Sequence, residues 1–155
     1  MHKEYQKDKL LEKINLLKKN GAVIGFTNGC FDLLHKGHIH SISHAKKKCD
    51  FLIVAINSDK SVKLLKGSQR PIDNERIRIK NLSSINDVDA VIVFSEETPI
   101  GIINYLLPNI LFKGTDYKFK KVVGSDIVLK NGGKIEFIKM LKGISTTKII
   151  KNSSN

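Results

Sequence analysis

Five short apolar runs, rich in β-branched residues, recur along the chain, and segments with helical periodicity lie between them. The run Phe51–Ile56 is apolar throughout, which is typical of a strand covered on both faces. Strands that alternate with helices predict an α/β protein with a mainly parallel five-stranded sheet and helices on both faces. The predicted strands are Ala22–Thr27, Phe51–Ile56, Ala90–Phe94, Ile110–Lys113 and Lys134–Ile138.

The segments between these runs carry helix signals. Leu10, Leu11, Ile14 and Leu17 mark one face of an amphipathic N-terminal helix. Residues 37–49 place apolar side chains at three-residue steps, which predicts a second helix. Start and stop signals predict further helices from an Asp73 cap to about Leu82, from a Thr98 cap followed by Pro99, before the Asn131-Gly132-Gly133 turn, and from a Ser145 cap through Ile150.

Length and composition fit one domain. The chain has 155 residues, of which 41% are apolar, and this is enough for a core without disulfides or metals. We expect a single domain over 1–155, with a helix in 1–20 and the core in 21–150. The sequence has no apolar run near the roughly 20 residues that span a bilayer and no secretory signal, so we expect a cytoplasmic protein. Cys30 and Cys49 lack metal-ligand spacing and are expected to be reduced thiols.

The net charge of +12 implies attraction to anions, which include nucleic acid, membrane surfaces and phosphorylated metabolites. Much of the excess is lysine scattered along the chain, and no aromatic platform lies between the lysines, as single-strand binding would need. A general compositional bias is therefore favoured over a polyanion-binding face.

A loop with two histidines follows the first predicted strand, in the segment Thr27–His38. In open parallel sheets, ligands bind beyond the carboxyl ends of the strands, next to the point where strand order reverses. A helix that begins near Gly37 offers free backbone N–H groups and the positive end of its dipole to phosphate, and Gly29 and Gly37 let the backbone approach closely. His35 and His38 lie three positions apart, so both imidazoles face one side if the helix starts at or just before His35.

The order of strand, glycine turn, Phe-Asp and HxGH favours a phosphate-binding role for His35 and His38 over a packing role. Phosphate charge would favour their protonated form. His40 and His44 have no glycine context and are expected to be surface or packing residues. For Cys30, a small residue in the turn is favoured over a catalytic thiol.

The segment resembles the signature of the cytidylyltransferase-like nucleotidyltransferase superfamily, whose members share HxGH on a Rossmann-like fold. Within it, the chain is similar to the D-glycero-β-D-manno-heptose 1-phosphate adenylyltransferases, often the second domain of bifunctional ADP-heptose synthases. The similarity runs from about Gly21 to Ile150 and includes several motifs in order. They are Thr27-Asn28-Gly29-Cys30-Phe31-Asp32, Val54-Ala55-Ile56-Asn57-Ser58-Asp59, Leu65-Lys66-Gly67, Arg70-Pro71, Lys113-Gly114-Thr115-Asp116-Tyr117, Gly124-Ser125, Asn131-Gly132-Gly133 and Ser145-Thr146-Thr147-Lys148-Ile149-Ile150.

The resemblance implies roles for particular residues. His35 and His38 would contact the triphosphate and stabilise the transition state, and Lys66 would hold the phosphates as a mobile cation, with a solvated loop lysine as the alternative. Asp32 would contact the metal or the acceptor, or would only stabilise the turn. The nucleotide-binding residues would be Thr27, Asn28, Gly29, Cys30, Phe31, Gly37, Lys63, Gly114, Asp116, Ser145, Thr146 and Thr147, with Ser145 also a helix cap and Lys63 evenly balanced against a solvated role.

The resemblance also implies transfer of AMP from ATP to a sugar 1-phosphate, with D-glycero-β-D-manno-heptose 1-phosphate as the favoured acceptor. The products would be pyrophosphate and ADP-heptose for lipopolysaccharide. Mg²⁺ or another divalent cation would be held largely by the triphosphate, with no metal held by protein alone. We expect a homodimer and a separate sugar kinase, with neither nucleic acid nor membrane as a partner.

Two alternatives remain open. One is a CTP-dependent cytidylyltransferase that acts on glycerol 3-phosphate or a similar phosphorylated alcohol. Relatives that make CDP-glycerol carry an arginine shortly before the Ile-Ser-Thr-Thr motif, where this chain has Met140-Leu141-Lys142-Gly143, and this difference favours the heptose interpretation. The basic Lys142-Gly143-Ile144 differs from the acidic-Gly-Cys sequence associated with the heptose enzymes. The more remote alternative is a non-enzymatic, basic nucleic-acid-binding protein.

Overall fold

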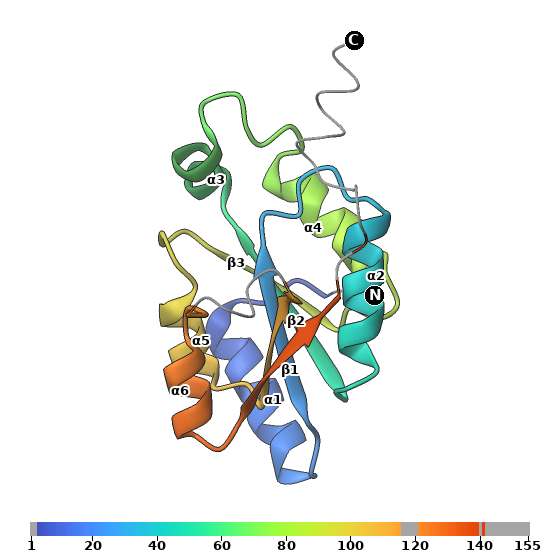
Figure 1. Cartoon of the computed structure of the whole chain (residues 1–155), viewed down its shortest axis with the longest axis vertical. Coiled ribbons are helices and arrows are strands. Elements are labelled where there is room, and N and C mark those ends of the chain that lie inside the picture. Colours follow the sequence, from blue (N-terminus) through green and yellow to red (C-terminus); the bar gives the residue numbers. More distant parts are fainter. Residues whose placement is uncertain (1–2, 116–120, 140, 142–155) are drawn as a thin grey trace.

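The computed structural model describes residues 3–115, 121–139 and 141, and its centre is a five-stranded sheet in the order β3-β2-β1-β4-β5 (Figure 1). All neighbouring strands are parallel. The chain passes outward from β1 to β3 and then crosses back to β4, so the strand order reverses between β1 and β4. This is the predicted α/β, Rossmann-like fold. The strands are β1 (Ile24–Gly29), β2 (Phe51–Asn57), β3 (Ala90–Phe94), β4 (Ile110–Gly114) and β5 (Lys134–Ile138).

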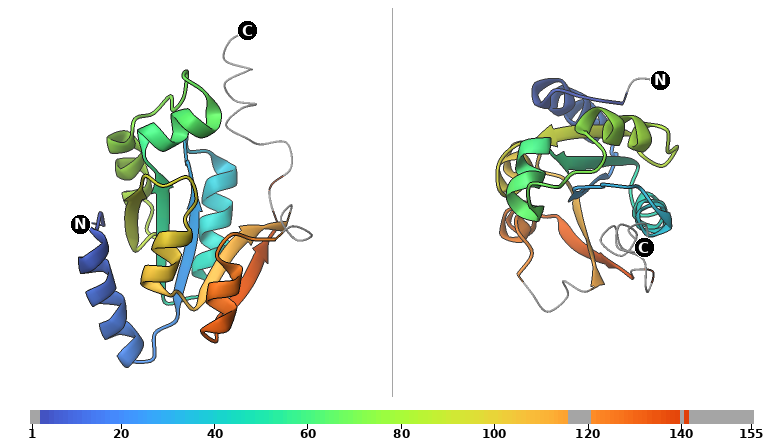
Figure 2. Two further views of the ribbon diagram at one scale, coloured as in Figure 1. Left: turned by 90° about the vertical axis from the view of Figure 1, so that its left-hand side faces the viewer. Right: turned by 90° about the horizontal axis from the view of Figure 1, so that it is seen from above.

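Helices cover both faces of the sheet. One face packs against α1, α5 and α6, and the other packs against α2 and α4. In the left view of Figure 2, α5 and α6 lie in front of the sheet and α2 lies behind it. The helices are α1 (Lys7–Lys19), α2 (Lys36–Lys46), α3 (Asp59–Lys66), α4 (Glu75–Ser83), α5 (Ile100–Leu106) and α6 (Ser125–Lys130).

Strand β2 shows why the sheet needs two helical layers. All of its residues are buried, and alternate side chains point to opposite faces. Ile53 and Ala55 belong to the cluster with α1, α5 and α6, whereas Leu52 and Val54 belong to the cluster with α2 and α4. The continuous apolar run therefore supplies both cores, as the sequence predicted.

The first strand begins and ends two residues later than predicted. Before it starts, the N–H of Val23 donates to the Asp50 carboxylate at 2.7 Å, and the Val23 carbonyl accepts the N–H of Asp50 at 2.8 Å. The N–H and carbonyl groups of Val23 are therefore hydrogen-bonded to Asp50, and the pairing of β1 with β2 begins at Ile24. At the other end the ladder continues until Gly29 lies opposite Ile56.

Two predicted helix caps are wrong by one residue. Asn74, not Asp73, caps α4, and its side chain accepts the N–H of Ile77. Asp73 lies one residue before the cap, and its N–H donates to the Asp32 carboxylate at 2.8 Å. In α5 the N-cap residue is Pro99 rather than Thr98.

Two further differences concern whole helices, and one predicted helix is not tested. The second helix spans Lys36–Lys46 rather than 37–49. Helix α3 was not predicted. The helix predicted for 145–150 lies outside the described residues. In the part of the chain that is described, no helix has the length and apolar character that a membrane crossing needs.

Candidate functional site

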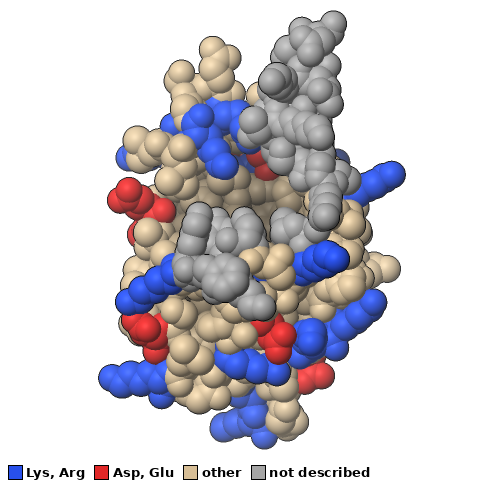
Figure 3. Space-filling view, in the orientation of Figure 1, with Lys and Arg blue, Asp and Glu red and all other residues tan. Residues whose placement is uncertain are grey.

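A cavity of about 360 Å³ opens at the carboxyl ends of β1 and β4, where the strand order reverses. On the face seen in Figure 3, a hollow lies in the upper half of the molecule, and basic side chains gather above it. The position is the one that parallel-sheet topology predicts for a ligand. The cavity is lined by Thr27, Asn28, Gly29, Cys30, Phe31, His38, Ser41, Ile42, Lys66, Phe112, Lys113, Gly114 and Ile138.

His35 and His38 cap the start of α2 reciprocally. His35 is the N-cap residue, and its Nδ1 accepts the N–H of Gly37 at 3.1 Å. The Nδ1 of His38 in turn accepts the N–H of His35 at 3.2 Å. The two rings are stacked with their centroids 3.9 Å apart, so both imidazoles lie on one side of the helix start.

This arrangement fixes the tautomer of both rings. A nitrogen that accepts a hydrogen bond carries no proton, so in the neutral imidazole the proton is on Nε2. Burial lowers the pKa of His35. Burial, aided by His35 and opposed by Asp32, lowers the pKa of His38 to about 4. Without a bound anion, each ring is therefore a neutral Nε2–H donor at neutral pH.

The glycine turn that precedes the histidines is tightly folded. Phe31 and Leu33 both have positive φ, near 50° and 54°. A Cβ on Gly29 would lie 3.1 Å from the Phe31 ring, and that ring lies 5.1 Å from the ring of His38. Glycine at 29 thus lets the phenylalanine fold back toward the histidine.

Cys30 lies in the same turn and lines the cavity. Burial raises the pKa of its thiol, and nearby basic side chains offset this only in part. The Sγ donates to the Asn57 Oδ1 at 3.7 Å. A protonated, hydrogen-bonded thiol fits a small residue in the turn better than a nucleophile.

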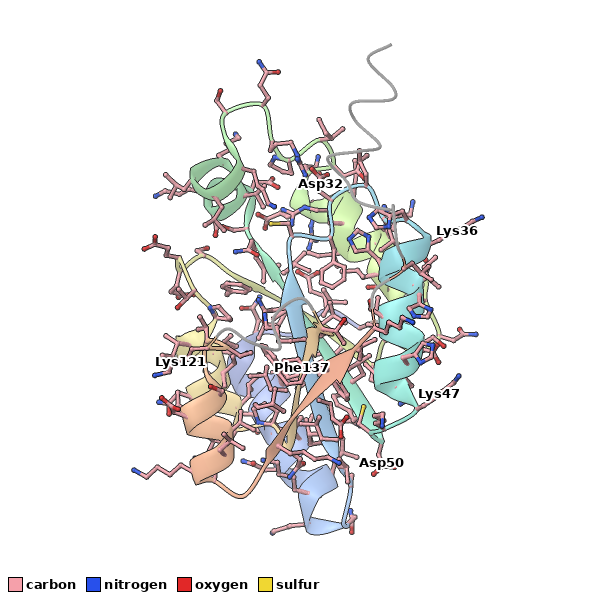
Figure 4. All side chains as sticks on the ribbon, viewed as in Figure 1. Asp32, Lys36, Lys47, Asp50, Lys121 and Phe137 are labelled. Carbon is pink, nitrogen blue, oxygen red and sulfur yellow. The ribbon has the colours of Figure 1, made fainter. Side chains whose placement is uncertain are left out.

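Asp32 is buried, with 1% of its surface exposed. Its carboxylate accepts the Nε of Arg70 at 2.9 Å and the N–H groups of Ile72 and Asp73 at 2.8 Å each. Burial opposes ionisation, but these hydrogen bonds outweigh it and lower the pKa. In Figure 4, Asp32 lies between the end of β1 and helix α4. The structure therefore favours the turn-stabilising role over contact with metal or acceptor.

Two lysines line the cavity. Lys66 is the last residue of α3 and is exposed, so it belongs to a helix end rather than to the loop of the sequence interpretation. Lys63, one turn earlier, does not line the cavity. Lys113, at the end of β4, donates its Nζ to the Asn28 Oδ1 at 3.0 Å across the switch point.

Of the predicted residues in the described part of the chain, eight line this cavity. Those outside the lining are His35, Gly37, Lys63 and Asp32, of which the first two form the start of α2 beneath His38. The predicted residues outside the described part of the chain are Asp116, Ser145, Thr146 and Thr147. His40 and His44 lie on the outer side of α2, and the His40 Nε2 is 3.1 Å from the carbonyl of Lys139.

Sequence reasoning missed several residues of the lining. Ile42, Phe112 and Ile138 contribute apolar surface to it, and Ser41 and Lys113 also line the cavity. Ser41 and Ile42 follow the histidines by one helical turn, and Lys113 ends a predicted strand at the switch point. Helix periodicity and strand-end position are therefore the sequence signals from which these residues could have been predicted.

The sequence matches the family described as cytidylyltransferase-like over residues 26–152. The chain belongs to the cytidylyltransferase-like family. The matched span includes the whole glycine turn, both capping histidines and Lys66.

Named relatives of this cytidylyltransferase-like chain include two called "Bifunctional protein HldE". The protein from Rhodospirillum rubrum is 50% identical over 139 residues, which is 90% of this chain and 28% of the relative. The one from Nitrobacter hamburgensis is 44% identical over 146 residues, which is 94% of this chain and 30% of the relative. The chain thus spans less than a third of the length of these relatives.

Two solved structures share the fold. The lipopolysaccharide core biosynthesis protein from Thermoplasma volcanium is 27% identical, with a TM-score of 0.65 over 80% of this chain and 100% of that chain. A pantoate-beta-alanine ligase from Francisella tularensis has a TM-score of 0.64 over 99% of this chain and 77% of that chain, at 19% identity. The second likeness concerns the fold alone.

Proposed function

We propose that this cytidylyltransferase-like chain is an adenylyltransferase that transfers AMP from ATP to a sugar 1-phosphate and releases pyrophosphate. The acceptor that the sequence motifs favour is D-glycero-β-D-manno-heptose 1-phosphate, and the product would be ADP-heptose. The observation that carries the proposal is the reciprocal cap of His35 and His38 beside the cavity at the β1–β4 switch point. Identity of 44–50% to the HldE proteins supports it.

The proposed step is in-line displacement at the α-phosphorus of ATP. An oxygen of the acceptor phosphate forms a new P–O bond, the bond to the β-phosphate oxygen breaks, and pyrophosphate leaves. The acceptor phosphate is already ionised at neutral pH, so no general base is needed. Catalysis would rest on positioning and on stabilising the charge that builds up around phosphorus and on the leaving group.

The residues at the start of α2 and at the end of α3 suit those tasks. The Nε2–H groups of His35 and His38 would donate to phosphate oxygens, and the positive end of the α2 dipole would attract them. Lys66 would add a full positive charge from the wall formed by α3. Gly29 and Gly37 keep the backbone free of side chains where the phosphates would pass.

The apolar part of the lining suits a flat, weakly polar group. Ile42, Phe112 and Ile138 contribute apolar surface to the cavity, and a nucleobase gains from burial against such side chains. Asp116, Ser145, Thr146 and Thr147 remain proposed nucleotide contacts on the basis of the motifs alone.

Mg²⁺ binds oxygen ligands, above all carboxylates and phosphates. No carboxylate is among the described residues that line the cavity, and the described part of the chain contains no cluster of three or more acidic, histidine or cysteine side chains placed to hold a metal. The protein side chains described therefore do not form a magnesium site. The cation proposed with ATP would be carried by the triphosphate.

The wider setting is also proposed. The chain would act as one domain and as a homodimer, in the cytoplasm where ATP is available. The sugar 1-phosphate would be supplied by a sugar kinase. Neither nucleic acid nor membrane is a proposed partner.

A pyrophosphate-release panel tests the proposed function. ATP and CTP are each combined with D-glycero-β-D-manno-heptose 1-phosphate, with glucose 1-phosphate and with glycerol 3-phosphate. We expect the highest kcat/KM for ATP with the heptose phosphate. Preference for CTP with glycerol 3-phosphate would replace the heptose assignment, and no release with any pair, together with steeply salt-dependent binding to DNA, would favour the non-enzymatic alternative.

A further inference from the structure

Helix α3 carries Lys66 at its end but has few buried residues to hold it. Ser61 and Val62, in the first half of the helix, are its buried residues. In the second half, the side chain of Leu64 is 80% exposed, and Leu65 is about half exposed. Figure 1 shows α3 at the edge of the molecule, apart from the helices on either face of the sheet. Side-chain packing therefore does not fix the direction of its second half.

The first turn of α3 is anchored instead. The Asp59 carboxylate accepts the Nη2 of Arg78 at 2.8 Å, and the N–H of Asp59 donates to the Glu75 carboxylate at 3.1 Å. Ser58 caps the helix by accepting the N–H of Ser61 at 3.2 Å. Because a helix is rigid over the about 10 Å from its first to its eighth residue, the anchored turn sets where Lys66 lies.

Arg78 also contacts the opposite wall of the cavity. Its side chain is fully buried, and its Nη1 donates to the carbonyls of Cys30 at 2.8 Å and Asn57 at 2.7 Å. Its Nε donates to the carbonyl of Asp73 at 3.0 Å. The guanidinium is planar and directs its N–H groups at fixed angles, so these contacts hold the glycine turn, the end of β2 and α3 in one fixed geometry.

Core packing does not explain an arginine at this position. Burying a charge is costly, and an apolar side chain of similar volume is often as stable or more stable in such a place. The counter-charge is one carboxylate, that of Asp59, whose side chain is 32% exposed. What the arginine provides and an apolar side chain lacks is the set of directed hydrogen bonds to both walls of the cavity.

We propose that Arg78 is a positioning residue that sets the distance between the two walls of the cavity. Through Asp59 it directs α3 and so places Lys66, and through the Cys30 carbonyl it holds the glycine turn that leads to the histidines. The inference depends on the proposed function only in that Lys66 contacts phosphate.

A double-mutant cycle on phosphate binding tests this. Binding of inorganic tripolyphosphate and of ATP to the full chain is measured by calorimetry, without acceptor, for Asp59→Ala, Lys66→Ala and the double variant. If Asp59 acts through the place of Lys66, each single change weakens binding by about tenfold, and the double variant binds no more weakly than Lys66→Ala alone. Arg78→Lys, which keeps the charge but not the planar fork, weakens binding in the same way.

Asp126→Ala is the matched control. Asp126 is also an acidic residue in the first turn of a helix, α6, where it pairs with Lys121, and its replacement leaves binding unchanged. Two results would overturn the positioning role. One is a fold-loss of binding in the double variant that equals the product of the two single losses, and the other is wild-type binding by both Asp59→Ala and Arg78→Lys. Thermal unfolding of each variant identifies loss of fold, in which case Asp59→Asn replaces Asp59→Ala. Turnover is not measured, so an inactive wild type in the acceptor panel would overturn the proposed function without deciding this cycle.

Discussion

The β1–α2 loop and helix α3 border the same cavity, but they are held in place differently. In the loop, the two histidine rings cap each other's backbone, and buried Asp32 accepts three hydrogen bonds. Helix α3 is fixed at its first turn, while its second half, with Lys66, is exposed. The neutral donors are therefore preorganised, whereas the cation is placed from a distance by the residues that anchor the first turn of α3.

The largest expected effect is a loss of kcat on the histidine side of the cavity. His38→Ala should lower kcat by about 10²–10³, because a preorganised donor to the transition state is lost. Loss of the cap to the His35 N–H should cost only about 1 kcal/mol of stability. Pyrophosphate release measures the rate. His44→Ala, on the same helix and outside the cavity, is the control and should have wild-type activity; equal rates for both variants would remove His38 from the site.

The second prediction concerns the rigidity of the loop. Asp32→Ala leaves Arg70 and two backbone N–H groups without their acceptor, and the free energy of unfolding should fall by about 3 kcal/mol. Urea unfolding measures the loss. Asp126→Ala, which removes an exposed ion pair, should leave stability unchanged. A loss for Asp32→Ala as small as that of the control would mean that the loop is not held by this carboxylate.

The third prediction concerns the exposed wall. Lys66→Ala should lower kcat/KM by about tenfold, or about 1.4 kcal/mol, because a charge that faces the phosphates is lost, with no change in stability, because its side chain is exposed. Lys63→Ala on the same helix should have less than a twofold effect, since Lys63 does not line the cavity. Equal losses for the two lysines would indicate general attraction by positive charge instead of a specific contact.

The fourth prediction is a pH dependence of stability. The pKa of His38 is about 4 in the folded protein and 6.5 for the free side chain, so the unfolded chain binds more protons between these values. Stability should therefore fall as pH falls from about 6.5 to about 4, by at most about 1.4 kcal/mol per pH unit. Urea unfolding across this range should show a shallower slope for His38→Ala, and an unchanged slope would mean that His38 is not buried as a neutral ring.

The sequence predicted the fold because its apolar runs are unambiguous. A run such as Phe51–Ile56 can be satisfied only between two helical layers, and five such runs separated by helical segments imply the parallel sheet. The loop with the two histidines was predicted for a similar reason, since glycine turn, histidines and helix start are consecutive in the chain. Both features depend on local sequence.

The features that sequence reasoning missed depend on contacts between distant segments. Helix α3 was not predicted because Leu64 and Leu65 are exposed, so its apolar residues do not mark a buried face. Arg78 lies in a helix with other charged residues, and nothing in its neighbourhood shows that it is buried. Asp32 was left between two roles because its partners, 38 to 41 residues away, are adjacent only in the folded chain.

The most direct test of the central claim observes the histidine rings themselves. Long-range ¹H–¹⁵N correlation spectra of the ring nitrogens are recorded with and without a non-hydrolysable ATP analogue. We predict the Nε2–H tautomer for both His35 and His38, and a shift of both Nε2 signals on addition of the analogue, while His40 and His44 stay unchanged. Saturable binding of the analogue without any change at His35 and His38 would contradict the account.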